Sequence, residues 1–298
     1  GGRGRPGAGR GLARGGGVGQ ARAAATERKG TGMRDLEGRK ALVTGGGTGL
    51  GRSISVKLAE RGAEVIVNYS RSAAEAAETA ALCRAAGAEA RTVQADVSTA
   101  EGAARLAEAA GERLDLLAAN AGVTRHAPKH ADLDALSAED FLSVYAVNVV
   151  GPYLALQALR PALVAAHAAT GRASPVLVTS SIAGVTGVGS SVAYAASKGA
   201  LNTMTLSLAR ALGPAIRVNA ICPGFIGTRW FKDQLDEGAY AAKVAAVEAA
   251  TPLQAASGPD DIADSALFLL SDASRHVTGE TLLVDAGTHL GFATLTAR

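Results

Sequence analysis

The feature that most constrains the fold is a regular alternation of short apolar runs with Ala-rich stretches of helical character. The apolar runs are KALVT (40–44), EVIVN (64–68), ARTVQ (90–94), LDLLAA (114–119), PVLVTS (175–180), IRVNAI (216–221) and TLLVD (281–285). The helical stretches are 50–61, 72–86, 99–111, 137–167, 193–212 and 259–271, and the C-caps of the first three are expected at Gly62, Gly87 and Gly111. Continuous apolar strands that alternate with helices are typical of a parallel sheet covered on both faces. The sequence therefore predicts an α/β fold, a doubly wound parallel sheet of about seven strands in a single domain.

The first 32 residues have a different character. They are mainly Gly, Ala and Arg without a hydrophobic period, so they are predicted to be disordered. Three interpretations remain open: an RGG-like arm that contacts nucleic acid, an Arg-rich targeting peptide, or sequence upstream of the true start. We favour the third, because Met33 is followed directly by residues that lead into the first strand. The domain plan is thus a tail (1–32) and one folded domain (33–298).

The charge of the chain is unevenly distributed. The net charge is +3, but residues 1–32 hold seven basic residues and one acidic residue, which leaves −3 for residues 33–298. The folded domain is therefore not expected to bind nucleic acid. No apolar run approaches the length of a membrane span, so we expect no membrane partner.

Cysteine and histidine usage indicates the compartment and argues against a metal. Cys83 and Cys222 are the only cysteines and lack CxxC spacing, which favours a reducing, cytoplasmic compartment. His126 and His130 are four residues apart, but Pro128 lies between them and no third ligand is near. We therefore predict no metal site.

A glycine-rich turn joins the first predicted strand to the first helix. It reads TGGGTGLG (44–51), in which Gly45, Gly49 and Gly51 follow the pattern T-G-x-x-x-G-x-G. Glycines let the backbone approach a pyrophosphate, and the following helix N-terminus offers free N–H groups and a positive dipole end. Its place at the start of a βαβ series predicts a dinucleotide site, and Leu50 is a further residue expected to contact the cofactor there.

The residues at the end of the second predicted strand are expected to contact the adenosine ribose of the dinucleotide. An acidic residue there would bind the 2′-hydroxyl of NAD and repel a 2′-phosphate. The sequence has Ser70 and Arg71 instead, which favours NADP(H) over NAD(H). The alternative is that Arg71 is only a solvated loop residue.

A Tyr and a Lys stand four residues apart in AYAASKGA (193–200), thirteen residues after a Ser at the end of a strand. Residues i and i+4 share one helix face, so Tyr194 and Lys198 are expected to lie together. The ammonium would lower the pKa of the phenol from its usual ~10 and make it a general acid or base. Ser181 could hydrogen-bond the same substrate oxygen.

These features together resemble the short-chain dehydrogenase/reductase family, which has a Rossmann-type fold. The resemblance covers residues 36–290 and rests on segments in family order and spacing. They are TGGGTGLG (44–51), DV (96–97), NAG (120–122), VNVVG (147–151), SSIAG (180–184), YAASK (194–198), PGFIGT (223–228) and TGETLLVDAG (278–287).

The resemblance implies a role for each matching residue. Tyr194 would be the acid/base, Lys198 would lower its pKa and hold the nicotinamide ribose, and Ser181 would orient the substrate carbonyl. Asn148 would support a water on the proton path. The remaining cofactor contacts implied are Asp96 and Val97 to adenine, Asn120 beside the ribose, and Ile226 and Thr228 to the nicotinamide carboxamide and pyrophosphate.

One part of this set can be argued from the residues. Pro152 has no N–H, so the carbonyl of Asn148, four residues earlier in a predicted helix, lacks its usual donor. A proline that merely bends a helix is the alternative.

The predicted activity is reduction of a ketone to a secondary alcohol with NADPH, as in the 3-oxoacyl-carrier-protein reductases that the chain resembles. An NAD-linked sugar or alcohol dehydrogenase and a non-catalytic dinucleotide-binding regulator are the alternatives. Residues 225–255 contain no predicted strand and interrupt the alternation, as a lid or substrate loop would. Trp230 and Phe231 there could be core or lid residues. The family is usually dimeric or tetrameric, so we expect a homo-oligomer, with a homotetramer favoured.

Overall fold

A computed structural model describes residues 1, 34–232 and 235–291 of the chain. The chain divides into two units, Gly1–Thr31 and Gly32–Arg298, and the fold described below belongs to the second. The predicted disorder of residues 1–32 falls, except for the first residue, outside the described residues and stays a prediction.

Seven parallel strands form one sheet in the order β3-β2-β1-β4-β5-β6-β7. The strands are β1 Lys40–Val43, β2 Glu64–Tyr69, β3 Ala90–Gln94, β4 Leu116–Ala119, β5 Ser174–Thr179, β6 Ile216–Pro223 and β7 Thr281–Val284. Each predicted apolar run is one of these strands, with its ends within two residues of the prediction. The doubly wound α/β fold is confirmed.

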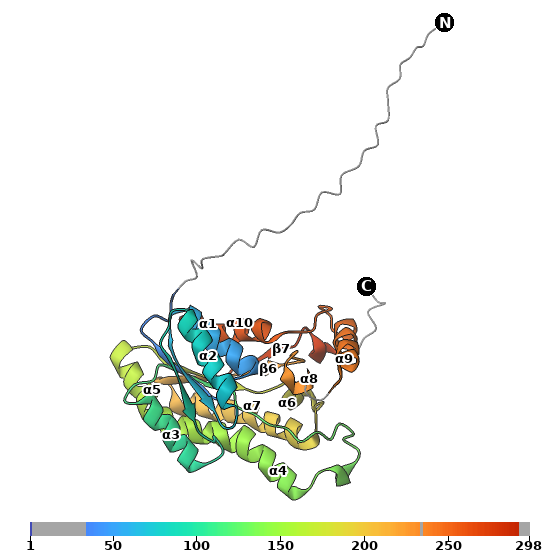
Figure 1. Cartoon of the computed structure of the whole chain (residues 1–298), viewed down its shortest axis with the longest axis horizontal. Helices are drawn as coiled ribbons and strands as arrows, with labels where there is room; N and C mark the ends of the chain where they lie inside the picture. The colour runs from blue at the N-terminus through green and yellow to red at the C-terminus, as the bar shows by residue number, and fades with distance from the viewer. Residues whose placement is uncertain (2–33, 233–234, 292–298) are drawn as a thin grey trace. The chain divides into compact units, whose positions relative to one another are not determined.

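Helices cover both faces of the sheet (Figure 1). They are α1 Gly49–Glu60, α2 Ala73–Ala85, α3 Ala100–Ala110, α4 Ala138–Tyr145, α5 Gly151–Thr170, α6 Ala183–Thr186, α7 Val192–Leu212, α8 Arg229–Lys232, α9 Glu237–Ala250 and α10 Pro259–Leu270. The helices α1, α2 and α10 pack in one hydrophobic cluster, and α3, α5 and α7 pack in another on the opposite face. The glycines expected to end the first three helices follow them with positive φ, as predicted.

The helix predicted over 137–167 has an irregular turn in its middle. A π-helical segment, Ala146–Val150, separates α4 from α5, and the N–H of Gly151 donates to the carbonyl of Ala146, five residues back. Pro152 lies in the first turn of α5, directly after this segment. The regular hydrogen bonding of the helix is thus interrupted at the predicted place, around Asn148.

The same stretch bears on the membrane prediction. Within the described residues, one stretch, Ala138–Thr170, is long and apolar enough to cross a membrane by length and composition alone. The expectation that no run approaches such a length is therefore wrong for this stretch. A core helix of a soluble protein passes the same test, and α5 packs its buried side chains against the sheet.

The described residues of the segment 225–255, which leave out 233–234, contain no strand, as predicted, but they hold two helices, α8 and α9, that the sequence did not lead us to expect. The longer one, α9, begins after the N-cap Asp236, whose side chain accepts the N–H of Ala239. None of its residues is buried. This helix therefore stands beside the core rather than within it.

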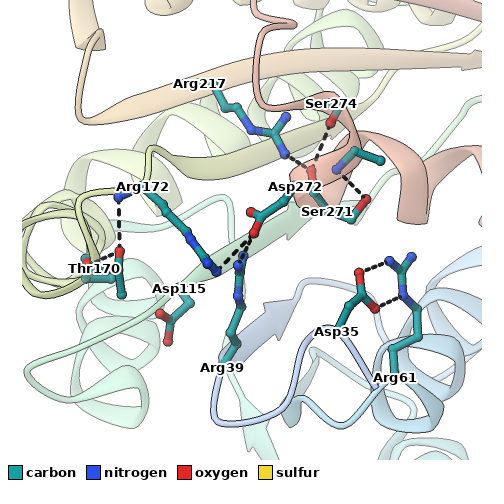
Figure 2. Close-up of polar contacts among 12 residues, drawn as sticks. Asp35, Arg39, Arg61, Asp115, Thr170, Arg172, Arg217, Ser271, Asp272 and Ser274 are labelled. Atoms are coloured by element: carbon teal, nitrogen blue, oxygen red, sulfur yellow. Dashed lines mark hydrogen bonds and ion pairs between the residues drawn. The ribbon is translucent and has the colours of Figure 1, made fainter. Parts of the chain in front are cut away.

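The amino ends of the strands are held by charged groups around Asp272, at the end of α10 (Figure 2). Its Oδ2 accepts from Nη2 of Arg39 at 2.6 Å and lies 3.0 Å from Nη1 of Arg172. Arg217, only 5% exposed, donates from Nη2 to the carbonyl of Ser271, and its Nη1 has no partner among the described residues. Burial lowers the pKa of Arg217 to about 10, and the charge of Asp272 opposes this shift. The site described below lies at the opposite ends of the strands, their carboxyl ends.

Candidate active site

The strand order reverses between β1 and β4, and ligands of doubly wound sheets bind at the carboxyl ends of the strands beside such a reversal. A cavity of about 820 Å³ lies there. It is lined by most of the predicted site residues, namely Gly45, Gly49, Leu50, Ser70, Arg71, Asp96, Val97, Asn120, Ser181, Tyr194, Lys198, Ile226 and Thr228. The two others, Gly51 and Asn148, do not line the cavity.

The glycine-rich turn leaves the start of α1 open toward the cavity. Gly45 and Gly49 have φ of +61° and +51°, which glycine adopts without strain. Thr48 is the N-cap of α1, and its side chain makes no capping hydrogen bond. The first amides of the helix thus remain suited to an anion such as a pyrophosphate.

Gly51 is required by close packing. A Cβ there would lie 2.1 Å from the carbonyl oxygen of Gly45 and 2.6 Å from Nδ2 of Asn120. That Nδ2 donates to the carbonyls of Thr44 and Gly45, while the Thr44 hydroxyl accepts the N–H of Asn120 at 2.9 Å. Asn120 therefore joins the end of β4 to the glycine-rich turn.

Two residues that the sequence did not single out hold the same turn. Asn68, buried at the end of β2, accepts the N–H of Gly45 with Oδ1 and donates from Nδ2 to three carbonyls. Arg52 of α1 donates to the carbonyl of Gly47 and to Thr79 of α2. An Asn at the end of an apolar strand was the one signal that could have identified the first of them.

The predicted adenosine end lies beyond β2 and β3. Ser70 and Arg71 are exposed and line the cavity together with Asp96. Hydrogen bonds from the side chain and backbone of Ser98 hold the pKa of Asp96 below its usual value, and the charge of Arg71 acts in the same direction. Arg71 therefore lies close enough to Asp96 for its charge to lower the pKa of that carboxyl group.

The predicted catalytic residues meet at the other end of the cavity. Ser181 follows β5, and Tyr194 lies in the first turn of α7, whose N-cap Ser191 accepts the N–H of Tyr194. Lys198 is one turn further along α7, with Nζ 5.5 Å from the centroid of the Tyr194 ring. The Nζ donates to the carbonyl of Thr179 at 2.8 Å. The three side chains predicted to act together therefore line one cavity.

The pKa values of this group differ from the prediction. Burial raises the pKa of Tyr194 to about 12, and contact with the Ser181 side chain opposes this shift. Burial also lowers the pKa of Lys198 to about 8. The prediction that Lys198 lowers the pKa of Tyr194 is wrong for this structure, because desolvation dominates and the ammonium donates to Thr179.

Asn148 does not line the cavity and is fully buried. Its Oδ1 accepts the N–H of Val123 at 2.8 Å, and its Nδ2 donates to the carbonyl of Val123 and to the hydroxyl of Ser197, both at 3.0 Å. The side chain thus ties the loop after β4 to α7, next to Lys198. Its predicted part in holding a water stays a prediction.

Trp230, in α8, lines the cavity beside Tyr194, the predicted acid/base. Its ring centroid is 6.1 Å from that of Tyr194, and the two planes are tilted by 54°. Of the two alternatives for Trp230, this position agrees with a lid residue. The side chain of Phe231 lies outside the described residues.

The two histidines considered as metal ligands are placed separately. Nε2 of His130 lies 3.2 Å from the carbonyl oxygen of Gly189, whereas His126 lines the cavity. Within the described part of the chain, no three His, Cys, Asp or Glu residues are grouped so that they could hold a metal.

Comparison with known proteins agrees with this architecture. The family model described as "Enoyl-(Acyl carrier protein) reductase" matches residues 45–289. A Streptomyces violaceoruber protein named "Granaticin polyketide synthase putative ketoacyl reductase 2" is 40% identical over 84% of this chain and 96% of its own length. The "L-rhamnose 1-dehydrogenase (NAD(P)(+))" of a Sphingomonas species is 35% identical over 87% of this chain and 99% of its own.

A solved structure gives the same result. The "Pseudomonas aeruginosa RhlG/NADP active-site complex" superposes with a TM-score of 0.77 and 34% identity, over 86% of this chain and 98% of that one. The fold, the matched residues and these identities lead to one conclusion. The chain belongs to the short-chain dehydrogenase/reductase family and is an oxidoreductase.

Proposed function

We propose that the protein reduces a ketone to a secondary alcohol with NADPH. The observation that carries the proposal is that Ser181, Tyr194 and Lys198 line the same cavity as the glycine-rich turn. A carbonyl group beside the three side chains would then be within reach of a dinucleotide bound at the turn.

The residues of the turn fit a dinucleotide. Because Gly51 has no side chain, α1 can pack closely against the glycine-rich turn. The start of α1, which has no side-chain cap, faces the cavity. Arg71 and Ser70 would hold a 2′-phosphate, while Asp96 and Val97 would border the adenine. Two solved structures similar to this chain are described as NADP complexes, and a relative is named for NAD(P)(+). When bound, the nicotinamide supplies the hydride.

The chain's own groups handle the proton. A pKa of about 12 keeps Tyr194 protonated at neutral pH, so its hydroxyl is ready to donate to a carbonyl oxygen that gains negative charge. Ser181, whose Oγ accepts the N–H of Ala183, would donate to the same oxygen and orient it. With a pKa of about 8, Lys198 is still mostly protonated at pH 7 and adds positive charge beneath the tyrosine. This arrangement supports the reduction direction.

The alternatives remain within the same site. An NAD-linked sugar or alcohol dehydrogenase would use the same three side chains in the oxidation direction, and the L-rhamnose 1-dehydrogenase relative favours it. A regulator without turnover would bind the cofactor but reduce no ketone, and its function would not depend on the Tyr194 hydroxyl.

We further infer a cytoplasmic homo-oligomer, with a tetramer favoured. Members of this family are typically soluble, act on small molecules and commonly oligomerise. The charge of −3 for residues 33–298 gives the folded domain no reason to bind nucleic acid. A chain beginning at Met33 should therefore keep cofactor binding and turnover, and a loss of either would refute the proposal that residues 1–32 precede the true start.

The test is binding of NADPH and NADH by the wild type, Arg71→Ala and the control Arg84→Ala, followed by turnover. Arg84 is exposed in the last turn of α2 and does not line the cavity. Charge-assisted hydrogen bonds to a phosphate predict that Arg71→Ala weakens NADPH binding about 10- to 100-fold and leaves NADH unaffected. Equal loss for both cofactors would refute the 2′-phosphate assignment. Turnover of acetoacetyl-N-acetylcysteamine that survives in Tyr194→Phe would refute the assignment of the proton donor.

A further inference from the structure

One wall of the cavity is a single face of α9. Lys243, Ala246, Val247 and Ala250 all line the cavity, and their spacing of three, four and seven residues places them on one side of the helix. None of them is buried in the core. Three positions on this face are small or apolar and one is cationic.

The lysine lies at the end of this wall that is farther from β7. Beyond the C-terminal end of α9, Thr251 is buried and the N–H of Leu253 donates to the carbonyl of Ala286, just after β7. That end of the helix is thus fixed at the edge of the sheet. Lys243 is about two helical turns, roughly 10 Å, further along the axis from Ala250.

The charges that line this part of the cavity are all basic. Asp96 is the one acidic lining residue in the described chain, and it follows β3, at the opposite edge of the sheet from β7. Arg229 lines the cavity but forms an ion pair of 2.8 Å with Glu75. No described residue forms an ion pair or hydrogen bond with Lys243. An apolar wall therefore ends in an ammonium group that no carboxylate of the described chain neutralises.

Other apolar side chains line the same cavity. Ile182 and Val188, from the segment between β5 and α7, and Trp230, from α8, are apolar. A sugar would present several hydroxyl groups, which lose hydrogen bonds to water when they face alanine and valine side chains. A mainly apolar molecule with one negative group matches this lining better.

We propose that the substrate is an apolar ketone that carries an anionic group, a carboxylate or a phosphate, at a distance from its carbonyl, and that Lys243 selects it by pairing with that group. This inference rests on the proposed function and assigns Lys243 as a residue that determines specificity.

The experiment compares each charged ketone with a neutral counterpart that has the same reacting ketone group. The first series is 4-oxopentanoate, 6-oxoheptanoate and 9-oxodecanoate, each beside its methyl ester, and the second is acetoacetyl-CoA beside acetoacetyl-N-acetylcysteamine. The value of kcat/KM with NADPH is measured for the wild type, Lys243→Gln and Lys129→Gln. Lys129 is an exposed control that carries the same charge but does not line the cavity.

We expect Lys243→Gln to lower the ratio of kcat/KM for the charged to the neutral member about tenfold, mainly through KM, because one charge-assisted contact is lost. Lys129→Gln should leave the ratio as in the wild type. A decrease confined to the first series would identify a carboxylate, and one confined to the second would identify the phosphates of the thioester carrier. Both results support the proposal.

Other results would overturn it. If the ketones are turned over but the ratio is the same in Lys243→Gln and the wild type in both series, Lys243 does not select an anion and the proposed function still stands. The same conclusion follows if the wild type prefers every neutral member. If the wild type turns over no ketone in either series, the proposed function fails and this inference fails with it.

Discussion

Replacing Gly51 by alanine should disturb the cofactor site and the fold together. The new Cβ would lie 2.1 Å from the carbonyl oxygen of Gly45 and 2.6 Å from Nδ2 of Asn120, so α1 or the glycine-rich turn must move by about 1 Å. Such overpacking costs about 1–3 kcal/mol. The displaced amide of Asn120 also loses hydrogen bonds of 3.2 and 3.4 Å, worth about 1 kcal/mol each.

Alanine's better helix propensity returns about 0.5–1 kcal/mol, so the free energy of unfolding should fall by about 2–4 kcal/mol. For a chain of this size the loss corresponds to a decrease in Tm of about 5–10 °C. The assay is thermal unfolding with NADPH titration of the wild type, Gly51→Ala and the control Gly238→Ala. At Gly238, in α9, a Cβ would meet only an Asp236 oxygen at 3.4 Å, an ordinary contact. If Gly51→Ala unfolds within a degree of the wild type and binds NADPH equally well, the packing argument is wrong.

Three further predictions concern other parts of the molecule. Burial lowers the pKa of Lys198 to about 8 from its usual 10.5, so between these two pH values the unfolded chain binds more protons than the folded chain. Stability relative to Lys198→Met should therefore rise over that range by about 3 kcal/mol, and a difference in urea midpoints that does not change with pH would contradict the pKa value. Asn148→Ala removes three hydrogen bonds and should lower the free energy of unfolding by about 3 kcal/mol in urea denaturation. Ser197→Ala removes one of these and the bond from its own hydroxyl to the carbonyl of Tyr194, so it should cost about 2 kcal/mol in the same assay. Asp272→Asn leaves Arg39 and Arg172 without their carboxylate and should lower the free energy of unfolding by about 2 kcal/mol in thermal unfolding, with NADPH affinity unchanged. An altered affinity would show that the amino ends of the strands are coupled to the site.

The strands and the order of the site residues could be predicted because each leaves a local signal. A strand buried on both faces is a continuous apolar run, and the turn after β1 needs glycine where φ is positive. The Tyr194 and Lys198 pair is visible as a spacing of four on one helix. These features depend on nearby residues, so the sequence alone shows them.

The remainder depends on contacts between distant segments. Asn68 supports the glycine-rich turn only because β2 lies beside β1, and the pKa of Tyr194 depends on how deeply several elements bury it. The helix α9 was missed for another reason: its sequence, EGAYAAKVAAVEAA, favours a helix, but the polar segment around it suggested a loop. An acidic N-cap before an Ala-rich run was the signal that could have identified it.

The attachment of α9 has a consequence for how this protein could change over evolution. Since none of its residues is buried, substitutions along the helix leave the hydrophobic clusters on the two faces of the sheet intact. Most replacements there should cost little stability while they reshape one wall of the cavity. The helix α9 can thus diverge almost independently of Ser181, Tyr194 and Lys198, so that these three side chains can be retained while the range of accepted substrates changes.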